Sequence, residues 1–339
     1  MKIVSEAEVK GKKVLVRCDF DVPLKNGTVA DEERIERSLK TIKCLVKKEA
    51  KVILLSHLGR PEGKVVAGLR LDPVAKSLSK KLDGAVIKLD ECLGNSVKET
   101  VAEMEKGDIV LLENLRFYKE EEKNDPEFAK KLSALGDIYV NEAIAVSHRS
   151  HASITGIPKY LPSYAGFNFA EEVKNFLKIL ENPRRPLVFL MGGAKPETKA
   201  PLVSKFAKIA NFVLVGGALM NDQNLKTQGN IIFPVDNIDK LDIGPKTITL
   251  FENYLKEAGT IVWNGPLSKY EEPKYVTGTK EIAKFFGKIN AFKVVGGGDT
   301  ITSVKRFGKL TDFDFVSSAG GAMLEFLAKG SLPGIESLN

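Results

Sequence analysis

The sequence of 339 residues is poor in the residues that assign a chain to a specialised class: it has three cysteines, three histidines and one tryptophan. Cys18, Cys44 and Cys92 have neither paired nor metal-like spacing, so no disulfide framework is expected. No apolar run approaches the ~18 residues that a membrane-spanning helix needs, and the first residues lack the apolar segment of a signal peptide. We therefore expect a cytoplasmic chain that does not contact a membrane.

Two nucleotide-binding motifs are also missing. The sequence has no G-x-G-x-x-G, which disfavours a dinucleotide-binding dehydrogenase, and no G-x-x-x-x-G-K-[ST], which argues against a P-loop protein. The net charge is +7, but the lysines are scattered and form no dense basic run. This pattern favours small anionic substrates over nucleic acid as partners.

Short apolar runs alternate with longer amphipathic stretches along the chain. The runs are continuously apolar, as in strands buried on both faces of a parallel sheet. Strand–helix alternation is typical of α/β folds, and the length, with 43% hydrophobic residues, suffices for two cores. We expect two doubly wound parallel-sheet (Rossmann-like) domains, with strands near residues 14–16, 52–55, 109–112, 138–140, 187–190, 212–215, 260–263, 293–295 and 313–316.

One amphipathic helix is predicted between about Ala170 and Asn182, where apolar and charged residues alternate. The proline that follows, Pro183, ends it. We interpret this segment as a helix that connects an N-terminal domain, residues 1–169, to a C-terminal domain, residues 183–325.

The residues that follow the apolar runs of the first half are basic or polar. Ligands bind at the carboxyl ends of strands in open α/β sheets, so these positions form a candidate site. Arginine makes forked hydrogen bonds with phosphate and carboxylate. Its repetition at strand ends favours one shared anion site over isolated surface or capping residues. The positions are Arg17–Asp21, Ser56–Pro61, Glu113–Arg116, and Asn141–Glu142 with His148–His151.

The corresponding positions in the second half carry glycine. Glycines before helix starts let backbone N–H groups approach phosphates closely, and their repetition favours a nucleotide-sized ligand over ordinary turns. Asp299, which follows three glycines, suits a metal ion that bridges phosphates. Lys195 and Lys199 suit neutralisation of phosphate charge. The glycine positions are 192–193, 216–217, 265, 296–298 and 320–321.

Arg34 breaks a local rule. It lies in the first turn of a helix predicted to start at Asp31, where basic residues are mildly unfavourable. A basic residue at this position, against the charge preference of the first helical turn, indicates a functional role. An ordinary surface arginine is an equally good interpretation of Arg34. An anionic acid on one domain and a nucleotide on the other together indicate a transfer between two substrates.

A set of motifs stands at the predicted strand ends. They are Arg17–Pro23, Leu55–Pro61, Glu113–Phe117, His148–Ser153, Gly192–Lys195, Val262–Pro266 and Gly296–Thr300. In this order they resemble the phosphoglycerate kinase family from end to end, more specifically in the first half than in the second. The resemblance implies two domains, a monomer, a Mg²⁺ cofactor, and reversible phosphoryl transfer between 1,3-bisphosphoglycerate and ADP, giving 3-phosphoglycerate and ATP. It also implies that residues 326–339 pack back on the N-terminal domain.

The same resemblance implies roles for individual residues. Arg34 and Lys195 would steady the transferring phosphoryl group, the Gly320-Gly321 turn would cradle it, and Asp299 would bind Mg²⁺. The residues expected at 3-phosphoglycerate are Asp19, Asp21, Arg34, His57, Arg60, Arg116 and Arg149. The residues expected at the nucleotide are Gly193, Lys195, Lys199, Gly216, Gly217, Leu241, Asn264, Pro266, Glu271, Gly298, Asp299 and Thr300.

Some positions depart from the family pattern. Asp21 stands where the family usually has asparagine, which puts a carboxylate near the substrate's negative charge, and Ala319 replaces a glycine. Pro196 and Pro201 flank Lys199 where the family has no prolines, which puts the placement of that lysine in question.

The predicted second domain is also short. Helical sequence that the family usually has after Gly229, and more before Leu241, is missing. This shortening motivates an alternative, a catalytically weakened relative that serves as a binding or regulatory protein. Retention of Arg34, Lys195, Lys199 and Asp299 favours the active kinase.

Overall fold

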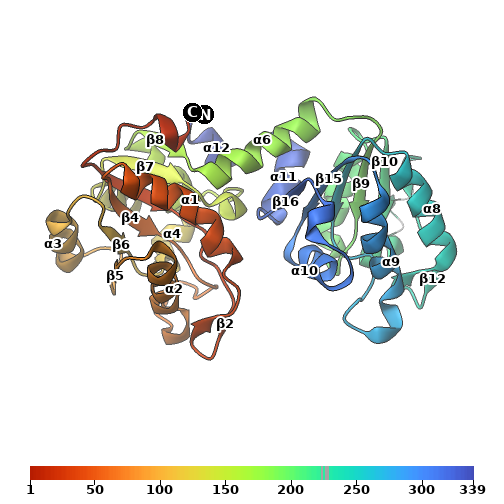
Figure 1. Ribbon diagram of the computed structural model, residues 1–339, viewed down its shortest axis with the longest axis horizontal. Helices are drawn as coiled ribbons and strands as arrows, with labels where there is room; N and C mark the ends of the chain where they lie inside the picture. The colour runs from red at the N-terminus through yellow and green to blue at the C-terminus, as the bar shows by residue number, and fades with distance from the viewer. Residues whose placement is uncertain (223, 226–228) are drawn as a thin grey trace. The chain divides into compact units, whose positions relative to one another are not determined.

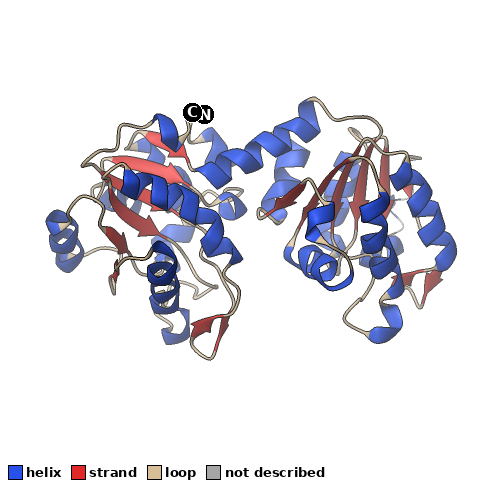
Figure 2. Cartoon of the chain, in the orientation of Figure 1, coloured by secondary structure: helices blue, strands red, loops and turns tan. Residues whose placement is uncertain are grey.

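The computed structural model describes residues 1–222, 224–225 and 229–339. Their contacts divide the chain into two compact units: unit 1 comprises Met1–Val173 and Ser331–Asn339, and unit 2 comprises Lys174–Gly330. Each unit contains a six-stranded sheet flanked by helices (Figure 1 and Figure 2). Within the described ranges, no helix combines the length and the apolar character needed to span a bilayer.

The sheet of unit 1 has the strand order β5-β6-β4-β1-β7-β8, and its neighbouring strands are all parallel. Its strands are β1 Lys13–Arg17, β4 Lys51–Leu55, β5 Val86–Lys88, β6 Ile109–Leu111, β7 Ile138–Asn141 and β8 Ser163–Ala165. A small antiparallel ladder pairs β2 Leu24–Lys25 with β3 Thr28–Val29. The helices of this unit are α1 Glu33–Lys47, α2 Asp72–Leu82, α3 Asn95–Glu103, α4 Lys119–Glu122, α5 Pro126–Ser133 and α12 Pro333–Glu336.

Strand β1 lies inside this sheet, between β4 and β7, and its residues 14–16 are fully buried. Helix α1 packs against the same core with Ile35, Ile42 and Leu45. Both faces of β1 are covered, so side chains on both faces are buried and residues 14–16 are all apolar.

Unit 2 repeats the architecture with the order β11-β10-β9-β14-β15-β16, again with parallel neighbours. The predicted pair of doubly wound α/β domains is therefore confirmed. The strands are β9 Leu187–Met191, β10 Phe212–Val215, β11 Ile231–Ile232, β14 Thr260–Asn264, β15 Phe292–Gly296 and β16 Phe315–Ser317, with a hairpin of β12 Asn237–Ile238 and β13 Asp242–Ile243. The helices are α7 Pro196–Phe206, α8 Pro245–Lys256, α9 Thr277–Phe285, α10 Gly298–Phe307 and α11 Gly321–Lys329.

Two predicted element starts are wrong. Helix α1 begins at Glu33 rather than at Asp31, because the Asp31 carboxylate accepts a hydrogen bond from the Glu33 N–H (2.9 Å) and so lies before the first turn. Strand β16 begins at Phe315 rather than at Phe313, which ends a short 3₁₀ turn.

The connecting helix α6, Phe167–Glu181, also begins earlier than the predicted Ala170. The Thr41 hydroxyl accepts from the Phe167 N–H (2.9 Å) and donates to Glu142 (2.7 Å). The buried Glu142 carboxylate accepts from the N–H groups of Asn168 (3.2 Å) and Phe169 (3.1 Å). These bonds satisfy donors that the first turn of a helix leaves open, so the helix can start at Phe167.

Helix α7 accommodates both of the unusual prolines. Pro196 is its first residue, where a missing N–H costs no helical hydrogen bond, whereas Pro201 lies inside the helix and removes one. Lys199 stays within the helix between them.

The last nine residues of the sequence, Ser331–Asn339, belong to unit 1. The Gly334 N–H donates to the Ser147 carbonyl (2.9 Å), and the Ser337 hydroxyl donates to the Ile154 carbonyl (3.2 Å). The preceding helix α11 belongs to unit 2, where the Phe326 ring lies 5.3 Å from that of Phe176.

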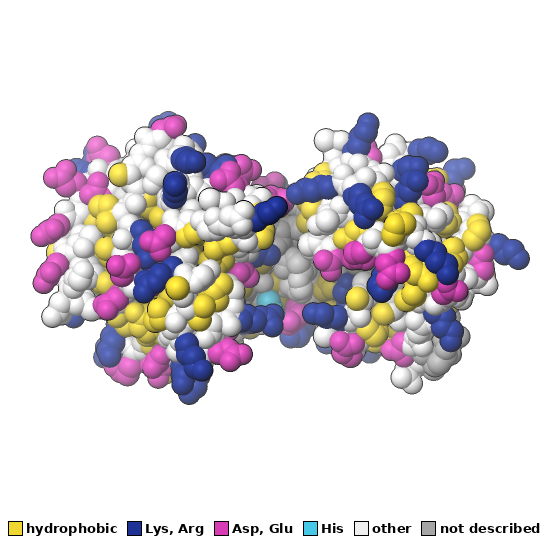
Figure 3. Space-filling model, turned by 90° about the horizontal axis from the view of Figure 1, so that it is seen from below, with side chains coloured by type: hydrophobic (Ala, Val, Ile, Leu, Met, Phe, Trp, Pro, Cys, Tyr) yellow, Lys and Arg dark blue, Asp and Glu magenta, His cyan; other side chains and the backbone are white. Residues whose placement is uncertain are grey.

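Lysine and arginine side chains are interspersed with aspartate and glutamate on the face drawn in Figure 3. Surface ion pairs such as Lys10–Glu49 (3.1 Å) and Lys329–Glu325 (2.7 Å) also mix the two signs of charge locally. The positive net charge is therefore spread over this face rather than gathered in one patch.

Candidate functional site

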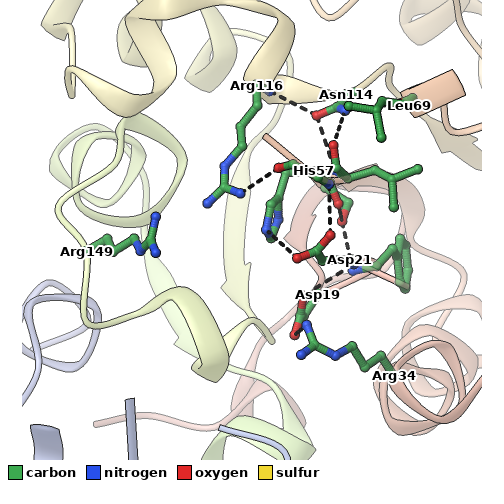
Figure 4. Close-up of polar contacts among 12 residues, drawn as sticks. Asp19, Asp21, Arg34, His57, Leu69, Asn114, Arg116 and Arg149 are labelled. Carbon is green, nitrogen blue, oxygen red and sulfur yellow. Dashed lines mark hydrogen bonds and ion pairs between the residues drawn. The ribbon is translucent and has the colours of Figure 1, made fainter. Parts of the chain in front are cut away.

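The predicted anion-binding residues of unit 1 stand after the carboxyl ends of its strands. Figure 4 shows Arg34, Asp19, Asp21, His57 and Arg116 in one region, with the Arg149 side chain directed toward them in this view. The Arg34 guanidinium donates to the Asp19 carboxylate (2.7 Å). The Asp19 side chain is 11% exposed and that of Arg34 is 40% exposed, so a nearly buried carboxylate holds a cation that remains accessible.

Asp21 joins two strand ends. Its carboxylate accepts from the Gly59 N–H (2.8 Å), in the loop after β4, and its other oxygen lies 3.8 Å from His57 Nε2. The side chain is 38% exposed. Asp21 therefore places a partly exposed negative charge among the predicted substrate residues. The neighbouring His57 does not balance this charge, because its imidazole is neutral for the reasons given next.

His57 is 1% exposed and receives a hydrogen bond from Arg17. An Arg17 Nη2 lies 3.1 Å from His57 Nδ1, and a guanidinium can only donate. Burial first, and then the nearby arginines, hold the pKa of the His57 imidazole well below its usual range. The ring is therefore neutral at physiological pH, with its proton on Nε2, the nitrogen that faces Asp21.

Asn114 organises the loops around Arg116. Its side-chain oxygen accepts from the N–H groups of Leu58 (3.2 Å) and Arg116 (3.1 Å), and its amide donates to the carbonyls of Leu58 (2.8 Å) and Leu69 (2.9 Å). The Arg116 Nη1 donates in turn to the Gly59 carbonyl (2.8 Å). Burial and the Arg17 charge lower the pKa of Arg116, which indicates a concentration of positive charge that an anionic ligand would relieve.

The two remaining predicted arginines of unit 1 lie farther toward solvent. Arg60 is exposed, and Arg149 is half-buried with its Nε 3.3 Å from His148 Nε2. Neither belongs to the bonded group formed by Asp19, Arg34 and their neighbours in the described part of the chain.

Sequence reasoning placed Arg17 among the strand-end residues of the anion site but gave no site role to Ser153 or Glu121. All three side chains are buried. Arg17 Nε donates to the Ser153 hydroxyl (2.8 Å), which donates to Glu121 (2.6 Å). Arg17 stood within a quoted motif, but Glu121 is one of three successive glutamates, and nothing in their pattern distinguishes the buried one.

In unit 2, the glycine-rich strand ends line a cavity of about 390 Å³. Most of the predicted nucleotide residues border it. They are Gly193, Lys195, Lys199, Asn264, Pro266, Gly298, Asp299 and Thr300, together with the predicted phosphoryl cradle Gly320 and Gly321.

Three helix N-termini meet at this cavity. Lys195 immediately precedes α7, Gly298 and Asp299 open α10, and Gly320 immediately precedes α11. The first N–H groups of a helix have no partner within it, and its N-terminus carries partial positive charge. Three such ends around one space make an environment for a multiply charged anion.

Lys199 adds a charged group to this cavity. Its ammonium donates to the Gly192 carbonyl (2.7 Å) and to the Asn264 side-chain oxygen (2.9 Å). Burial lowers the pKa of Lys199 to about 8, and the charge of Asp299 opposes that shift. Pro196 and Pro201 have therefore not displaced this lysine from the glycine-lined strand ends.

Close backbone approach explains two of the glycines. A Cβ on Gly192 would lie 2.1 Å from the Pro266 carbonyl oxygen, and a Cβ on Gly265 would lie 2.1 Å from the Gly192 carbonyl oxygen. Gly265 also has a φ of +98°, in the left-handed region. Larger residues would force the ends of β9 and β14 apart and change the cavity floor.

A second cavity of about 310 Å³ adjoins the first, because both are lined by Gly193, Ala194, Pro266 and Asp299. Gly217, Leu241 and Glu271, all predicted at the nucleotide, border it. Asn221 also borders it. The lining further includes residues that sequence reasoning did not assign: Ala218, Lys240, Ser268 and Lys269.

Gly216 and Thr300 have structural contacts of their own. Gly216 borders neither of the two cavities, and a Cβ there would lie 2.9 Å from the Leu267 side chain. The Thr300 hydroxyl accepts from the Gly265 N–H (2.7 Å), so it braces the turn after β14 even though it borders the larger cavity.

No cluster of three or more histidine, cysteine, aspartate or glutamate side chains suited to a metal occurs in the described portion of the chain. Asp299 lines both cavities at the start of α10. A single carboxylate fits an ion such as Mg²⁺ that takes its remaining ligands from phosphates and water.

Comparison with known proteins gives a consistent family. The sequence matches the family model described as phosphoglycerate kinase over residues 4–232 and 221–330. The phosphoglycerate kinase of Dictyoglomus turgidum is 41% identical over 381 aligned positions, which cover 97% of this chain and 96% of that protein. The corresponding protein of Desulforapulum autotrophicum is 40% identical over 392 positions, with 100% of both chains covered. These alignments are longer than the chain, so the relatives contain segments that it lacks.

Solved structures agree with this result. The structure of phosphoglycerate kinase from Coxiella burnetii matches with a TM-score of 0.86 and 34% identity, covering 99% of this chain and 98% of the other. The structure from Pyrococcus horikoshii also has a TM-score of 0.86, with 29% identity and coverage of 100% and 98%.

Proposed function

Because the chain belongs to the phosphoglycerate kinase family, we propose that it transfers a phosphoryl group reversibly between 1,3-bisphosphoglycerate and ADP, giving 3-phosphoglycerate and ATP. One observation carries this proposal in the structure. Three helix N-termini and Lys199 surround a cavity that adjoins a second one of comparable size. That arrangement suits the polyphosphate and the nucleoside of one nucleotide.

The phosphorylated acid is assigned to the strand ends of unit 1. Arg60, Arg116 and Arg149 supply guanidinium groups for carboxylate and phosphate oxygens, and His57 supplies a neutral N–H donor. Asp19 acts through Arg34, whose guanidinium it holds at 2.7 Å. Asp21 opposes the anion with its own charge.

The nucleotide is assigned to unit 2. Lys195, Lys199 and the helix N-termini neutralise the phosphates, and the smaller cavity takes the base and ribose, with Glu271 at the ribose. Phosphoryl transfer depends on positioning and charge neutralisation more than on covalent chemistry. Arg34, Lys195 and the Gly320-Gly321 turn would stabilise the charge of the transferring group.

Asp299 is the residue that would hold Mg²⁺. When bound, the ion supplies neutralisation of charge on the phosphate oxygens. Asp299 lies in the first turn of α10 and lines both cavities, and its carboxylate would be the ion's protein ligand.

The alternative is a weakened relative that binds without turnover. The shortened second half favours it, whereas the grouping of Lys195, Lys199 and Asp299 around one cavity favours the active enzyme. We expect a monomer that works in the cytoplasm.

A coupled assay with ADP and 1,3-bisphosphoglycerate tests the proposal directly. Formation of ATP that stops in excess chelator and returns with added Mg²⁺ is the expected result. An Asp299→Ala variant should lose activity while its binding of 3-phosphoglycerate, measured by calorimetry, stays close to that of the unaltered protein. Binding of both ligands without any ATP formation would establish the alternative.

A further inference from the structure

A buried chain of hydrogen bonds leads from Glu121 to His57. Glu121, in α4, is 0% exposed and accepts from the Ser153 N–H (2.9 Å) and from the Ser153 hydroxyl (2.6 Å). The Ser153 carbonyl accepts from the Tyr139 hydroxyl (2.6 Å), which fixes the backbone at this residue. The serine is therefore held by both its main chain and its side chain.

The direction of each bond follows from the donors available. The single hydroxyl hydrogen of Ser153 goes to Glu121, so its lone pairs face Arg17 Nε at 2.8 Å. Arg17 also donates to the Cys18 carbonyl and, through Nη2, to His57 Nδ1 at 3.1 Å. A guanidinium has no acceptor, so His57 Nδ1 must present its lone pair, and the ring proton must lie on Nε2.

This tautomer matters because His57 Nε2 faces the strand-end site, 3.8 Å from Asp21. A ring with its proton on Nε2 donates to an anion without being charged. The opposite tautomer would present a lone pair and repel the anion. Arg17 occupies Nδ1, so a second proton cannot be added there without breaking the chain.

We propose that Glu121 and Ser153 are positioning residues that hold Arg17, and through it His57, in the geometry that makes the His57 ring a neutral donor to the phosphorylated acid. They act at a distance from the ligand, because both are buried behind Arg17. This inference rests on the proposed function only in naming the phosphorylated acid as the ligand of His57. The tautomer itself is a property of the ligand-free protein.

A simpler role for Glu121 is that of a buried counter-ion to Arg17. His151 Nδ1 also lies 3.9 Å from Glu121 and, like His57, has a lowered pKa, about 3, so it adds no positive charge. A counter-ion would stabilise the fold without determining which nitrogen of His57 carries the proton. The tautomer of His57 therefore distinguishes a positioning role for Glu121 from a counter-ion role.

The test is ¹⁵N NMR of the histidine rings in the ligand-free protein. The protonated and unprotonated ring nitrogens have well-separated shifts, and the signals of His57 are identified by their loss in a His57→Gln variant. The expected result is a proton on Nε2 in the unaltered protein. A proton on Nδ1 overturns the proposal, and this measurement needs no variant of Glu121 or Ser153 that folds.

The Ser153→Ala and Glu121→Gln variants extend the test. A mixture of His57 tautomers is expected in Ser153→Ala, and a weaker bias toward Nε2 in Glu121→Gln. In Ser153→Ala the KM for 3-phosphoglycerate should rise about fivefold, the equivalent of one hydrogen bond of ~1 kcal/mol, with kcat nearly unchanged.

Ser133→Ala is the matched control, because Ser133 is also buried and its hydroxyl donates to a carbonyl of its own helix, that of Lys130 (2.8 Å). It should leave both tautomer and KM unaltered. A raised KM in Ser153→Ala with an unchanged tautomer would overturn the proposal in favour of the counter-ion role. Loss of ATP formation in the unaltered protein would instead contradict the proposed function and leave the tautomer result standing.

Discussion

Arg34 combines accessibility with a fixed position, since Asp19 holds its guanidinium at 2.7 Å while 40% of the side chain is exposed. We expect Arg34→Ala to reduce kcat by about 10³–10⁵, the cost of losing a cation that acts chiefly in a phosphoryl-transfer transition state, with a small change in KM. Steady-state kinetics in both directions would measure this.

Arg37→Ala is a matched control, because Arg37 lies one turn along the same helix and pairs with Glu33 (2.8 Å). It should leave kcat close to that of the unaltered protein. If Arg34→Ala retains kcat within about tenfold, ~1.4 kcal/mol, another group stabilises the transition state.

Asp21 is predicted to weaken binding of the anionic acid. An asparagine side-chain oxygen can still accept from the Gly59 N–H, at 2.8 Å in the unaltered protein, while the negative charge is removed. A unit charge at ~4 Å in water is worth ~1 kcal/mol, so Asp21→Asn should lower the KM for 3-phosphoglycerate about fivefold. Asp31→Asn serves as the control: it also removes one negative charge, just before α1, and should leave the KM for 3-phosphoglycerate unchanged. A higher KM in Asp21→Asn would indicate that the carboxylate has a structural role.

Lys199 should make nucleotide binding depend on pH. Its pKa is lowered to about 8 by burial, and a bound phosphate favours the charged form, so the pKa is higher in the complex. Affinity for ADP should therefore be constant below about pH 7 and fall as pH rises through about 8, because the free protein then loses a proton that the complex keeps. Calorimetric titrations across this range measure the effect.

In Lys199→Met, affinity should be lower near neutral pH and the inflection near pH 8 should disappear. Lys205→Met, a change at an exposed position in the last turn of the same helix, should retain both. An inflection that persists without Lys199 belongs to another group.

At the level of single residues, the sequence predicts the strand-end side chains but not the buried contacts behind them. Strand-end arginines, histidine and glycines were assigned to sites because they follow apolar runs. The positioning of Arg17 by Ser153 and Glu121 depends on contacts between segments more than thirty residues apart in the sequence, 32 for Ser153–Glu121 and 136 for Arg17–Ser153. No local pattern encodes such contacts.

Among the elements, the β12–β13 hairpin bears most on specificity. Its turn residues Lys240 and Leu241 line the smaller cavity, and Leu241 is 38% exposed. The Asp239 carboxylate in the same turn pairs with Lys274 (2.6 Å) and accepts from the Tyr275 hydroxyl (3.0 Å), which anchors the hairpin. A short, partly exposed hairpin therefore forms part of the wall of the smaller cavity.

We predict that this wall discriminates weakly between purine bases. A pocket without buried polar groups matched to one base separates ligands by only ~1–3 kcal/mol. The ratio of kcat/KM for ADP, GDP and IDP at one Mg²⁺ concentration measures it, and the KM for ADP should be high. A preference for ADP beyond about a thousandfold, ~4 kcal/mol, would indicate a complete pocket. We expect any such completion to come from the stretch Asn221–Thr227. Asn221 borders the smaller cavity, whereas Gln223, Lys226 and Thr227 lie outside the described residues.

Long elements were more predictable than short ones. Strands such as β4 and β14 coincide with apolar runs because both of their faces are buried. Strands β5 and β8 were not predicted although β6 is equally short. Strand β6 is apolar and buried throughout, whereas β5 and β8 are only partly buried and contain the polar residues Lys88 and Ser163. Strand β11 has two residues, too few to form a pattern. The early start of α6 depends on Thr41 and Glu142, which are remote from it in sequence.

At the scale of the whole molecule, we predict that the two units close on each other for the reaction. The residues assigned to the acid belong to unit 1 and those assigned to the nucleotide belong to unit 2, whereas transfer needs reacting atoms ~3–3.5 Å apart. We expect small-angle scattering to show a smaller radius of gyration with both ligands than with none. The single ligands serve as controls, and an unchanged radius with both would contradict the assignment of the two sites.

Unit 1 is discontinuous in sequence, whereas unit 2 is one continuous stretch inserted into it. During synthesis on the ribosome, unit 2 can complete its fold as soon as Gly330 emerges. Unit 1 must wait for Ser331–Asn339, although most of it was made first. Until then Ser147 and Ile154 lack the hydrogen bonds from Gly334 and Ser337. Of the two units, the one whose synthesis begins first is therefore the one that is completed second.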